Sequence, residues 1–251
     1  MVIKWDVTVP PLSGEKVRKG YVYLPESYDR EPEKRYPVMY MFDGHNVFFD
    51  SDATFGKSWG MKDYMDRTGK ELIIVGIACN DEGSRRLNEY SPVDFTYEPI
   101  GKIEGQGKLY MDWLVGTLKP YIDSTYRTLP GREHTLIAGS SMGGLMSLYA
   151  ACHYNSVFQR AACLSPSLWV APEAVELLLK EGTPNADTCI YMDYGSEEMD
   201  NHLDSSRMLQ TAVRLLLEKG VKLTFRIVPG GSHCEASWEK QIPVFMECLS
   251  L

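Results

Sequence analysis

Short apolar runs with strand character alternate with longer stretches of helical spacing along the chain. The runs are Gly20–Leu24, Pro37–Phe42, Leu72–Ala78, His134–Ala138, Arg160–Leu164, Cys189–Asp193 and Leu223–Val228, and residues 2–9 alternate apolar and polar positions. The helical stretches are Lys108–Ser124, Leu145–Tyr154, Pro172–Lys180 and Leu203–Lys219. Such alternation is typical of a parallel sheet with helices on both faces. We therefore expect an α/β fold with a mostly parallel central sheet of about eight strands.

The pattern continues from end to end without an interdomain linker, an internal repeat or a low-complexity segment. We expect residues 1–251 to form a single domain, because one α/β core is common at this length. Residues 2–9 and the runs at Gly20–Leu24 and Pro37–Phe42 are expected to form an antiparallel opening of the sheet. The one long irregular region, Asn80–Gly107, is rich in Gly, Pro and charge, and long loops in compact domains are often functional.

Composition narrows the classes of function. Hydrophobic residues make up 44% of the chain and charged residues 24%, with a formal net charge of −8. An acidic surface repels phosphate backbones and anionic membranes, so we expect neither a nucleic-acid partner nor a membrane partner. The sequence contains no basic leader region, no apolar run long enough for a membrane helix and no CxxC pair among its six cysteines. These features favour a cytoplasmic protein with reduced cysteines.

The pentapeptide Gly139-Ser140-Ser141-Met142-Gly143 matches G-x-S-x-G, with a buried strand predicted before it and helical spacing after it. A turn this abrupt strains the backbone of the serine and leaves no room for Cβ atoms at the flanking positions. It also presents the hydroxyl at the carboxyl edge of the sheet, near a helix N-terminus. This is the nucleophile-elbow motif of α/β-hydrolases, and it predicts Ser141 as a catalytic nucleophile. A Gly/Ser-rich turn of an ordinary doubly wound sheet is the alternative.

A serine hydroxyl needs a base that accepts its proton and later returns it to the leaving group. Among the five histidines, His233 follows the last predicted strand on a glycine-containing loop, from which it can reach across the edge of the sheet. We therefore predict His233 as the general base, with a solvated loop histidine as the alternative interpretation. His134, His153 and His202 lie at the starts or ends of predicted elements and are interpreted as structural.

The third catalytic group is a carboxylate that orients the imidazole, and in this motif it lies between the serine and the histidine in the chain. Four acidic side chains fall between positions 193 and 200. Asp193 is expected to lie within its strand. Among the others, Glu198 is preferred, with Asp200 and then Glu197 as alternatives. The competing interpretation for each of these residues is a carboxylate that stabilises a helix N-terminus through the helix macrodipole.

Backbone N–H groups are needed to stabilise the oxyanion of a tetrahedral intermediate. The N–H of Met142, at the start of a predicted helix, supplies one. The buried run that ends at position 42 continues into Asp43-Gly44-His45-Asn46, where the glycine lets the backbone approach closely. We predict the backbone N–H of His45 as the second donor. A plain Asp-Gly turn is the alternative.

Together these segments resemble the putative-esterase family of α/β-hydrolases, which includes esterase D, feruloyl esterases, siderophore esterases and the mycolyltransferase antigens. The matching strings are Tyr40-Met41-Phe42-Asp43-Gly44-His45-Asn46, Arg86-Leu87-Asn88-Glu89-Tyr90-Ser91-Pro92, Gly139 to Gly144, and Gly230-Gly231-Ser232-His233 with Trp238. They span residues 40 to 238. The resemblance implies an α/β-hydrolase fold with little or no lid. When the family pattern is aligned with Gly195-Ser196-Glu197-Glu198, the resemblance implies that Glu198 is the catalytic carboxylate.

The resemblance also implies a serine carboxylic-ester hydrolase that works through an acyl-enzyme on a small-molecule ester. Carbohydrate-linked acyl or aromatic esters are favoured, with siderophore or short-chain acyl esters as an alternative. Acyl transfer to a sugar or another alcohol is a further alternative. A noncatalytic α/β-hydrolase-like binding protein is the alternative of another class, which the presence of both Ser141 and His233 disfavours. No pattern in the sequence indicates an oligomeric state.

Substrate contacts are expected from Asp43, Gly44, Arg86 and Trp169. Arg86 offers a cation to an anionic or polyhydroxylated group, and Trp169 offers an aromatic edge. A solvated loop arginine and a core aromatic are the respective alternatives. We expect no metal and no cofactor, because the Asp, His and Cys residues lack the spacing of zinc ligands and no phosphate loop or dinucleotide fingerprint occurs.

Overall fold

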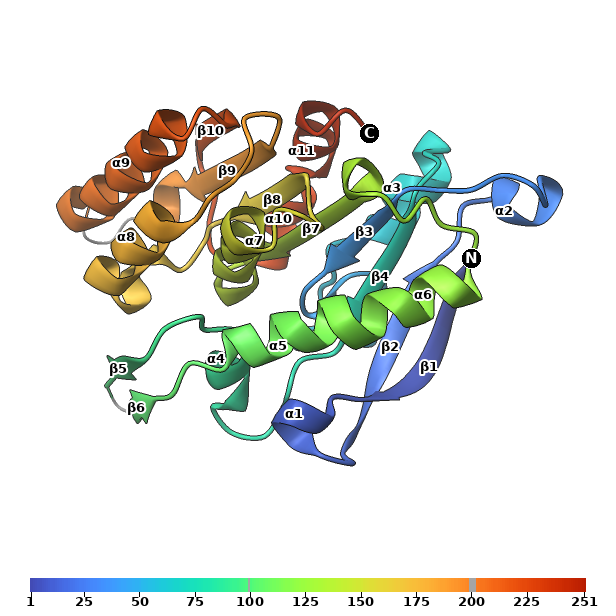
Figure 1. The fold of residues 1–251 in the computed structure, drawn as a ribbon, viewed down its shortest axis with the longest axis horizontal. Helices are drawn as coiled ribbons and strands as arrows, with labels where there is room; N and C mark the ends of the chain where they lie inside the picture. Colours follow the sequence, from blue (N-terminus) through green and yellow to red (C-terminus); the bar gives the residue numbers. More distant parts are fainter. Residues whose placement is uncertain (99, 199–201) are drawn as a thin grey trace.

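The computed structural model describes residues 1–98, 100–198 and 202–251, which are arranged around an eight-stranded sheet (Figure 1). Its strands are β1 (Val2–Thr8), β2 (Val17–Tyr23), β3 (Val38–Met41), β4 (Ile73–Ile77), β7 (Thr135–Ser140), β8 (Arg160–Leu164), β9 (Cys189–Gly195) and β10 (Lys222–Val228). Their order across the sheet is β1-β2-β4-β3-β7-β8-β9-β10. Each predicted strand segment becomes a strand of this sheet. The predicted α/β class is confirmed.

The antiparallel part of the sheet is confined to one edge. β1 pairs antiparallel with β2, and β2 pairs antiparallel with β4. β3 pairs parallel with both β4 and β7, and the pairings from β7 to β10 are also parallel. The expectation that Pro37–Phe42 belongs to the antiparallel opening was therefore wrong. The chain between β3 and β4 contains helix α3 (Met61–Thr68) and returns as a crossover connection, which a parallel pair requires.

The helices follow the predicted pattern, with several short additions. They are α1 (Pro10–Ser13), α2 (Ser27–Arg30), α3, α4 (Arg85–Glu89), α5 (Gly107–Trp113), α6 (Lys119–Thr125), α7 (Met142–His153), α8 (Pro172–Glu181), α9 (His202–Glu218), α10 (Glu235–Glu239) and α11 (Ile242–Cys248). The predicted helix Lys108–Ser124 consists of α5 and α6 joined by a π-helical segment, Leu114–Leu118. Asn80–Gly107, expected to be irregular, contains α4 and a hairpin of β5 (Phe95–Tyr97) and β6 (Gly101–Ile103). These elements are too short to leave a periodic signal among the surrounding Gly, Pro and charged residues.

Alternation along β3 divides the core between the two faces of the sheet. Val38 and Tyr40 belong to one cluster, together with buried residues of α5, α7, α8 and α9. Met39 and Met41 belong to the other, with residues of α3, α10 and α11. Helices therefore cover both faces, as the period of two along a strand implies (Figure 1). No helix in the described part of the chain is both long and apolar enough to cross a membrane.

The loop after β3 passes directly over β4. A Cβ built on Gly44 would lie 2.4 Å from the carbonyl carbon of Gly76 and 2.6 Å from the backbone nitrogen of Ile77. Both atoms are strand backbone, which cannot move aside as a flexible side chain would. The glycine at position 44 therefore sets how closely this loop approaches the sheet, and with it the position of His45.

Gly44→Ala should lower the free energy of unfolding by about 1–3 kcal/mol, because overpacking against backbone forces the loop or the strand to shift. Urea denaturation followed by circular dichroism measures the change. Gly116→Ala is the matched control, since Gly116 is exposed on a helical segment and a Cβ there would meet nothing within 4 Å. Alanine at position 116 should leave stability unchanged or raise it by up to ~1 kcal/mol. Equal losses for the two variants would contradict the close approach of Gly44 to β4.

Candidate active site

Ser141 occupies the turn between β7 and α7 with a strained backbone, at φ 58° and ψ −124°. Its N–H donates to the carbonyl oxygen of Leu164 at 3.0 Å, which joins the turn to the end of β8. A Cβ on Gly139 would lie 2.7 Å from the backbone of Gly143, and one on Gly144 would lie 2.6 Å from the carbonyl oxygen of Leu164. A Cβ on Gly143, the second flanking glycine of the motif, would lie 2.8 Å from Cβ of Phe42, so close approach requires both flanking glycines, as expected from the sequence.

The Ser141 side chain lines a cleft of about 460 Å³ that His233 also lines. In this conformation the Oγ atoms of Ser141 and Ser167 share a hydrogen bond of 3.3 Å, and no hydrogen bond joins the described side chains of Ser141 and His233. Ser167 is held in turn by its own N–H, which donates to the carbonyl oxygen of Ser141 at 3.1 Å. Hydrogen bonds between a nucleophile and its base are often long in unliganded enzymes and tighten when substrate binds.

His233 is held by a buried carboxylate. Its Nδ1 lies 2.7 Å from Oε2 of Glu198. The Glu198 side chain is 4% exposed and that of His233 is 45% exposed, so the carboxylate lies behind the ring. Trp238 packs edge-on against the imidazole, with ring centroids 5.0 Å apart. A proton on Nδ1, shared with the carboxylate, leaves Nε2 as the ring nitrogen that can accept a proton.

Two further donors fix the Glu198 carboxylate. The Ser165 hydroxyl donates to Oε1 at 2.7 Å, and the backbone N–H of Gly195 donates to the same oxygen at 3.0 Å. The indole N–H of Trp238 in turn donates to Oγ of Ser165 at 2.9 Å. Ser165 was not predicted from the sequence. The signal that points to it is the polar Ser-Pro-Ser stretch directly after β8, at the edge where the carboxyl ends of parallel strands meet.

Glu198 is the described acidic residue that contacts His233. Glu197 is exposed, and its carboxylate accepts a hydrogen bond of 3.5 Å from the Ser196 hydroxyl. Asp200, the other alternative from the sequence, lies outside the described residues. The geometry therefore favours Glu198 over Glu197.

Asp193 is a second buried carboxylate next to this network. It lies within β9, as expected, and is 1% exposed. It accepts hydrogen bonds from the Tyr191 hydroxyl at 2.7 Å and from the backbone N–H of Ser165 at 3.2 Å. Burial raises the pKa of Asp193 from 3.8 to about 6, the two hydrogen bonds oppose this rise, and the nearby charge of Glu198 adds to it.

The two predicted oxyanion donors belong to neighbouring loops at the same edge of the sheet. Met142 is the first residue of α7, and His45 lies in the 3-10 turn Gly44–Asn46. The first N–H groups of a helical segment have no acceptor within that segment. β3 and β7 pair in parallel with Met41 opposite Ala138, so the loop after β3 emerges beside the turn after β7.

Arg86, predicted to bind substrate, lines the cleft but is joined to Asp43. Its Nε and Nη2 atoms donate to the two carboxylate oxygens of Asp43, each at 2.7 Å. Burial pushes the pKa of Asp43 up, but the charge and the hydrogen bonds of Arg86 outweigh burial and lower the pKa overall. A bidentate pair of this kind is geometrically specific. It fastens the loop after β3 to α4, and the two charges offset each other at the wall of the cleft.

The ligand atoms of Asp43, His45 and Cys79 lie within 4.8 Å of one another, which raises the question of a metal site. Both oxygens of Asp43 already accept hydrogen bonds from Arg86. Burial raises the pKa of the Cys79 thiol, which keeps it protonated, and burial lowers the pKa of His45, whose Nε2 contacts Oγ1 of Thr54 at 3.0 Å. Metal binding needs a deprotonated thiol and a free carboxylate. The pairing of Asp43 with Arg86 and the protonated Cys79 thiol disfavour a metal centre, although Nδ1 of His45 is buried without a hydrogen-bond partner among the described residues.

Two of the predicted substrate contacts are not among the described residues that line the cleft. Trp169 is 44% exposed and packs against Tyr97 and Phe95, with ring centroids 5.5 and 6.4 Å apart. Gly44 faces the backbone of β4. Asp43 and Arg86 do line the cleft, as an ion pair.

Several residues of the cleft, among them Phe55, Cys234 and Glu235, were not predicted from the sequence. Phe55 stands at its rim and is 81% exposed, and Cys234 and Glu235 follow His233 directly. No periodicity or motif marks them. Their closeness to His233 in the sequence was the one signal for the last two.

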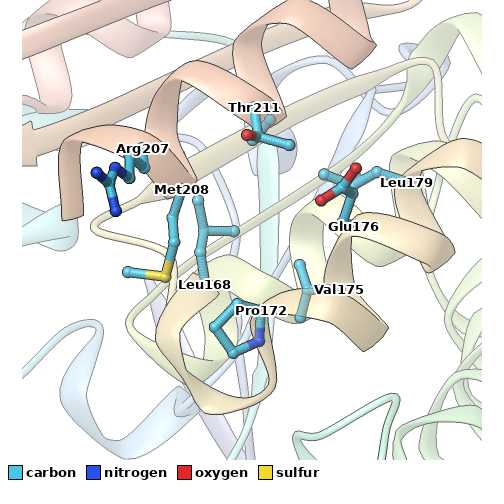
Figure 2. Close-up of a pocket in the computed structure, with 9 residues that line it drawn as sticks. Leu168, Pro172, Val175, Glu176, Leu179, Arg207, Met208 and Thr211 are labelled. Atoms are coloured by element: carbon cyan, nitrogen blue, oxygen red, sulfur yellow. The ribbon is translucent and has the colours of Figure 1, made fainter. Parts of the chain in front are cut away.

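A second hollow, of about 180 Å³, lies between α8 and α9 (Figure 2). Met208 and Thr211 project into it from α9, while Val175 and Leu179 project from α8. None of the predicted catalytic residues is among the described residues that line this hollow. It is therefore separate from the cleft of Ser141 and His233.

Comparison with known proteins identifies the family to which this chain belongs. The model of the family described as “Putative esterase” matches residues 13–246, and this chain belongs to that family. The protein YbbA of Bacillus subtilis (strain 168) is 27% identical over 186 residues, which cover 72% of this chain and 69% of YbbA. An endo-1,4-beta-xylanase/feruloyl esterase of Xylanibacter ruminicola is 25% identical over 239 residues, which cover 94% of this chain but only 30% of that longer protein.

Superposition on solved structures agrees with membership of the esterase family. The solved structure of a ferulic acid esterase superposes with a TM-score of 0.70 at 21% sequence identity, covering 99% of this chain and 98% of that chain. An identity this low establishes the fold alone. The expected α/β-hydrolase fold and the resemblance to the esterase family are both confirmed.

Asp193→Asn should make the stability of the protein less dependent on pH. A carboxyl whose pKa is raised by folding contributes stability below about pH 4, where it is protonated in both states, and this contribution is lost as the pH rises through about 6. Raising the pKa from 3.8 to about 6 corresponds to about 3 kcal/mol. The free energy of unfolding of the variant, measured in urea relative to the wild type, should therefore rise by up to about 3 kcal/mol between pH 4 and pH 7. A constant difference between the two proteins over this range would contradict the raised pKa.

Proposed function

We propose that this chain is a serine carboxylic-ester hydrolase that works through an acyl-enzyme on Ser141. Membership of the esterase family supports an ester substrate. The observation that carries the proposal is the 2.7 Å contact between His233 and Glu198 beside the cleft that Ser141 lines. A hydroxyl, an imidazole and a buried carboxylate are the three groups that this type of nucleophilic catalysis uses.

In the proposed acylation step, His233 acts as the base. Glu198 holds Nδ1, so Nε2 accepts the proton of the Ser141 hydroxyl while Oγ attacks the carbonyl carbon of the ester. The attack follows rotation of the Ser141 side chain away from Ser167 and toward the imidazole. The imidazolium then gives its proton to the leaving alkoxide oxygen, the bond between carbonyl carbon and alkoxide breaks, and the acyl group stays on Ser141.

In the proposed deacylation step, water takes the place of the alcohol. His233 accepts a proton from a water molecule whose oxygen attacks the acyl carbon, and it returns that proton to Oγ of Ser141 as the acid product leaves. The backbone N–H groups of Met142 and His45 stabilise the oxyanion in both steps. Loss of a single oxyanion donor costs on the order of 10²–10³ in rate.

Carbohydrate-linked acyl or aromatic esters are the proposed substrate class. Two similar proteins carry the names ferulic acid esterase and endo-1,4-beta-xylanase/feruloyl esterase, which supports this choice. The cleft offers matching chemistry, because the exposed ring of Phe55 provides an apolar rim and the side chains of Asn46 and Thr54 provide hydrogen-bonding groups.

Ser141→Ala should abolish ester hydrolysis while leaving the fold intact. Removing the nucleophile should lower kcat by about 10⁴-fold or more on p-nitrophenyl acetate, p-nitrophenyl butyrate and ethyl ferulate. Ser140→Ala, at the neighbouring serine, is the matched control and should lose less than about tenfold. Circular dichroism establishes that both variants fold. Rates for Ser141→Ala close to those of the wild type would sink the proposal.

Glu198→Gln should lower kcat by about 10³–10⁴-fold, because a neutral amide no longer stabilises the imidazolium and no longer selects the productive tautomer. Glu197→Gln is the matched control at an exposed neighbouring carboxylate, and its kcat should stay within about twofold of the wild type. Both are measured on p-nitrophenyl butyrate. A larger loss for Glu197→Gln, or for Asp200→Asn, would reassign the acid.

A further inference from the structure

Glu235 is a buried carboxylate at the wall of the candidate active site. It is the first residue of α10 and follows His233 by two positions. Only 7% of its surface is exposed, and it lines the same cleft as Ser141 and His233. The carboxylate therefore lies close to the candidate nucleophile and base, yet no step of the proposed mechanism uses it.

The side chain of Glu235 is poorly satisfied by the protein. From other residues it receives one described side-chain hydrogen bond, from Nδ2 of Asn46 at 3.3 Å, which is long for such a bond, and its own backbone N–H adds a local contact. Oδ1 of Asn46 accepts the backbone N–H of Thr54 at 3.0 Å, so the amide is oriented with its nitrogen toward Glu235. Among the ion pairs of the described residues, none involves Glu235.

Glu89 is another buried carboxylate of the same molecule, and it is paired with a cation. It is 1% exposed, lies 2.8 Å from Nη1 of Arg18, and accepts the backbone N–H of Asn80 at 2.7 Å. Glu235 is 7% exposed, and among the described residues it forms no ion pair and receives no hydrogen bond from another residue shorter than 3.3 Å. A buried polar group without adequate partners is unfavourable and is rare outside functional sites.

The environment also disfavours the charged form of Glu235. Burial raises its pKa and the negative charge of Asp43 adds to this effect, while the backbone N–H of Glu235 and the nearby Arg86 and His233 oppose the rise without reversing it. Because Glu235 lines the cleft, a hydroxyl that enters there can donate the hydrogen bond that the protein does not supply. Arg86 lines the same cleft with its charge already matched by Asp43, so a neutral donor suits the site better than a second cation.

We propose that Glu235 accepts a hydrogen bond from a hydroxyl group of the substrate, so that the site selects esters that carry a hydroxyl near the scissile bond. This inference rests on the proposed function and narrows its substrate class. The hydroxyl belongs either to the alcohol part of the ester, as in a polyol ester, or to the acyl part. A site built to bind a hydroxyl rejects the analogue that lacks it, because the buried acceptor is then left unpaired.

The test compares kcat/KM within two pairs of esters that differ only in hydroxyl groups. Glycerol 1-monobutyrate and propyl butyrate differ in the alcohol part, whereas ethyl 3-hydroxybutyrate and ethyl butyrate differ in the acyl part. The wild type should prefer the hydroxylated member of at least one pair. In Glu235→Ala the preference within that pair should fall by about 10- to 100-fold, and the pair that responds identifies which part of the ester carries the hydroxyl.

Two further variants keep the test decisive. Glu239→Ala removes a carboxylate from the same helix that is 40% exposed and paired with Lys57 at 2.8 Å, and the preference should not change. Glu235→Gln preserves the shape of the side chain and removes its charge, and it should reduce the preference for the hydroxylated ester by about 3- to 10-fold. This variant tests the inference if Glu235→Ala does not fold. No preference in the wild type, or an unchanged preference in a folded Glu235 variant, would overturn the inference. Failure to hydrolyse any of the four esters would instead count against the proposed function.

Discussion

The backbone of Ser141 holds its left-handed conformation because the positions around it carry no side chain. A Cβ on Gly139 would clash with Gly143, and one on Gly144 would clash with the end of β8. Strain of this kind costs about 1–3 kcal/mol and persists only where the surrounding structure enforces it. Here the enforcement comes from β7, α7 and β8, which approach one another too closely for a relaxed turn. The other groups of the candidate site are arranged around this one bend.

Parallel pairing gathers those groups at one edge of the sheet. The loop after β3 lies beside the bend after β7, while β8, β9 and β10 end on the other side of it. Ser165, at the end of β8, contacts both Glu198 after β9 and Trp238 in α10. One hydroxyl thus joins the carboxylate to the helix that packs against the His233 ring. The orientation of the imidazole therefore depends on packing between segments that are distant in the sequence.

The local features of this site could be predicted from the sequence, because short motifs encode them. The strand, the glycines and the helical spacing around Ser141 indicated the bend, and the glycine loop after the last strand indicated His233. The choice between Glu198 and Glu197 depends on which way a side chain points from a 3-10 turn, which spacing does not encode. Ser165 could not be predicted, because its role consists of hydrogen bonds between elements. The direction of the strand at 37–42 likewise depends on a crossover helix that the sequence pattern did not reveal.

Two glutamates at the same site illustrate how the environment divides chemical roles. Glu198 accepts three hydrogen bonds from the protein, one of them from His233, so its carboxylate is engaged in orienting the imidazole. From other residues Glu235 receives one long hydrogen bond, from Asn46, and it lines the cleft. A carboxylate whose partners are all internal gives rigidity, whereas one whose partners are incomplete keeps an acceptor for whatever occupies the cleft. Burial of the Glu235 carboxylate is unfavourable in the unliganded protein. A substrate hydroxyl that donates to this carboxylate relieves that cost, whereas a substrate without the hydroxyl does not, and the site therefore discriminates between them.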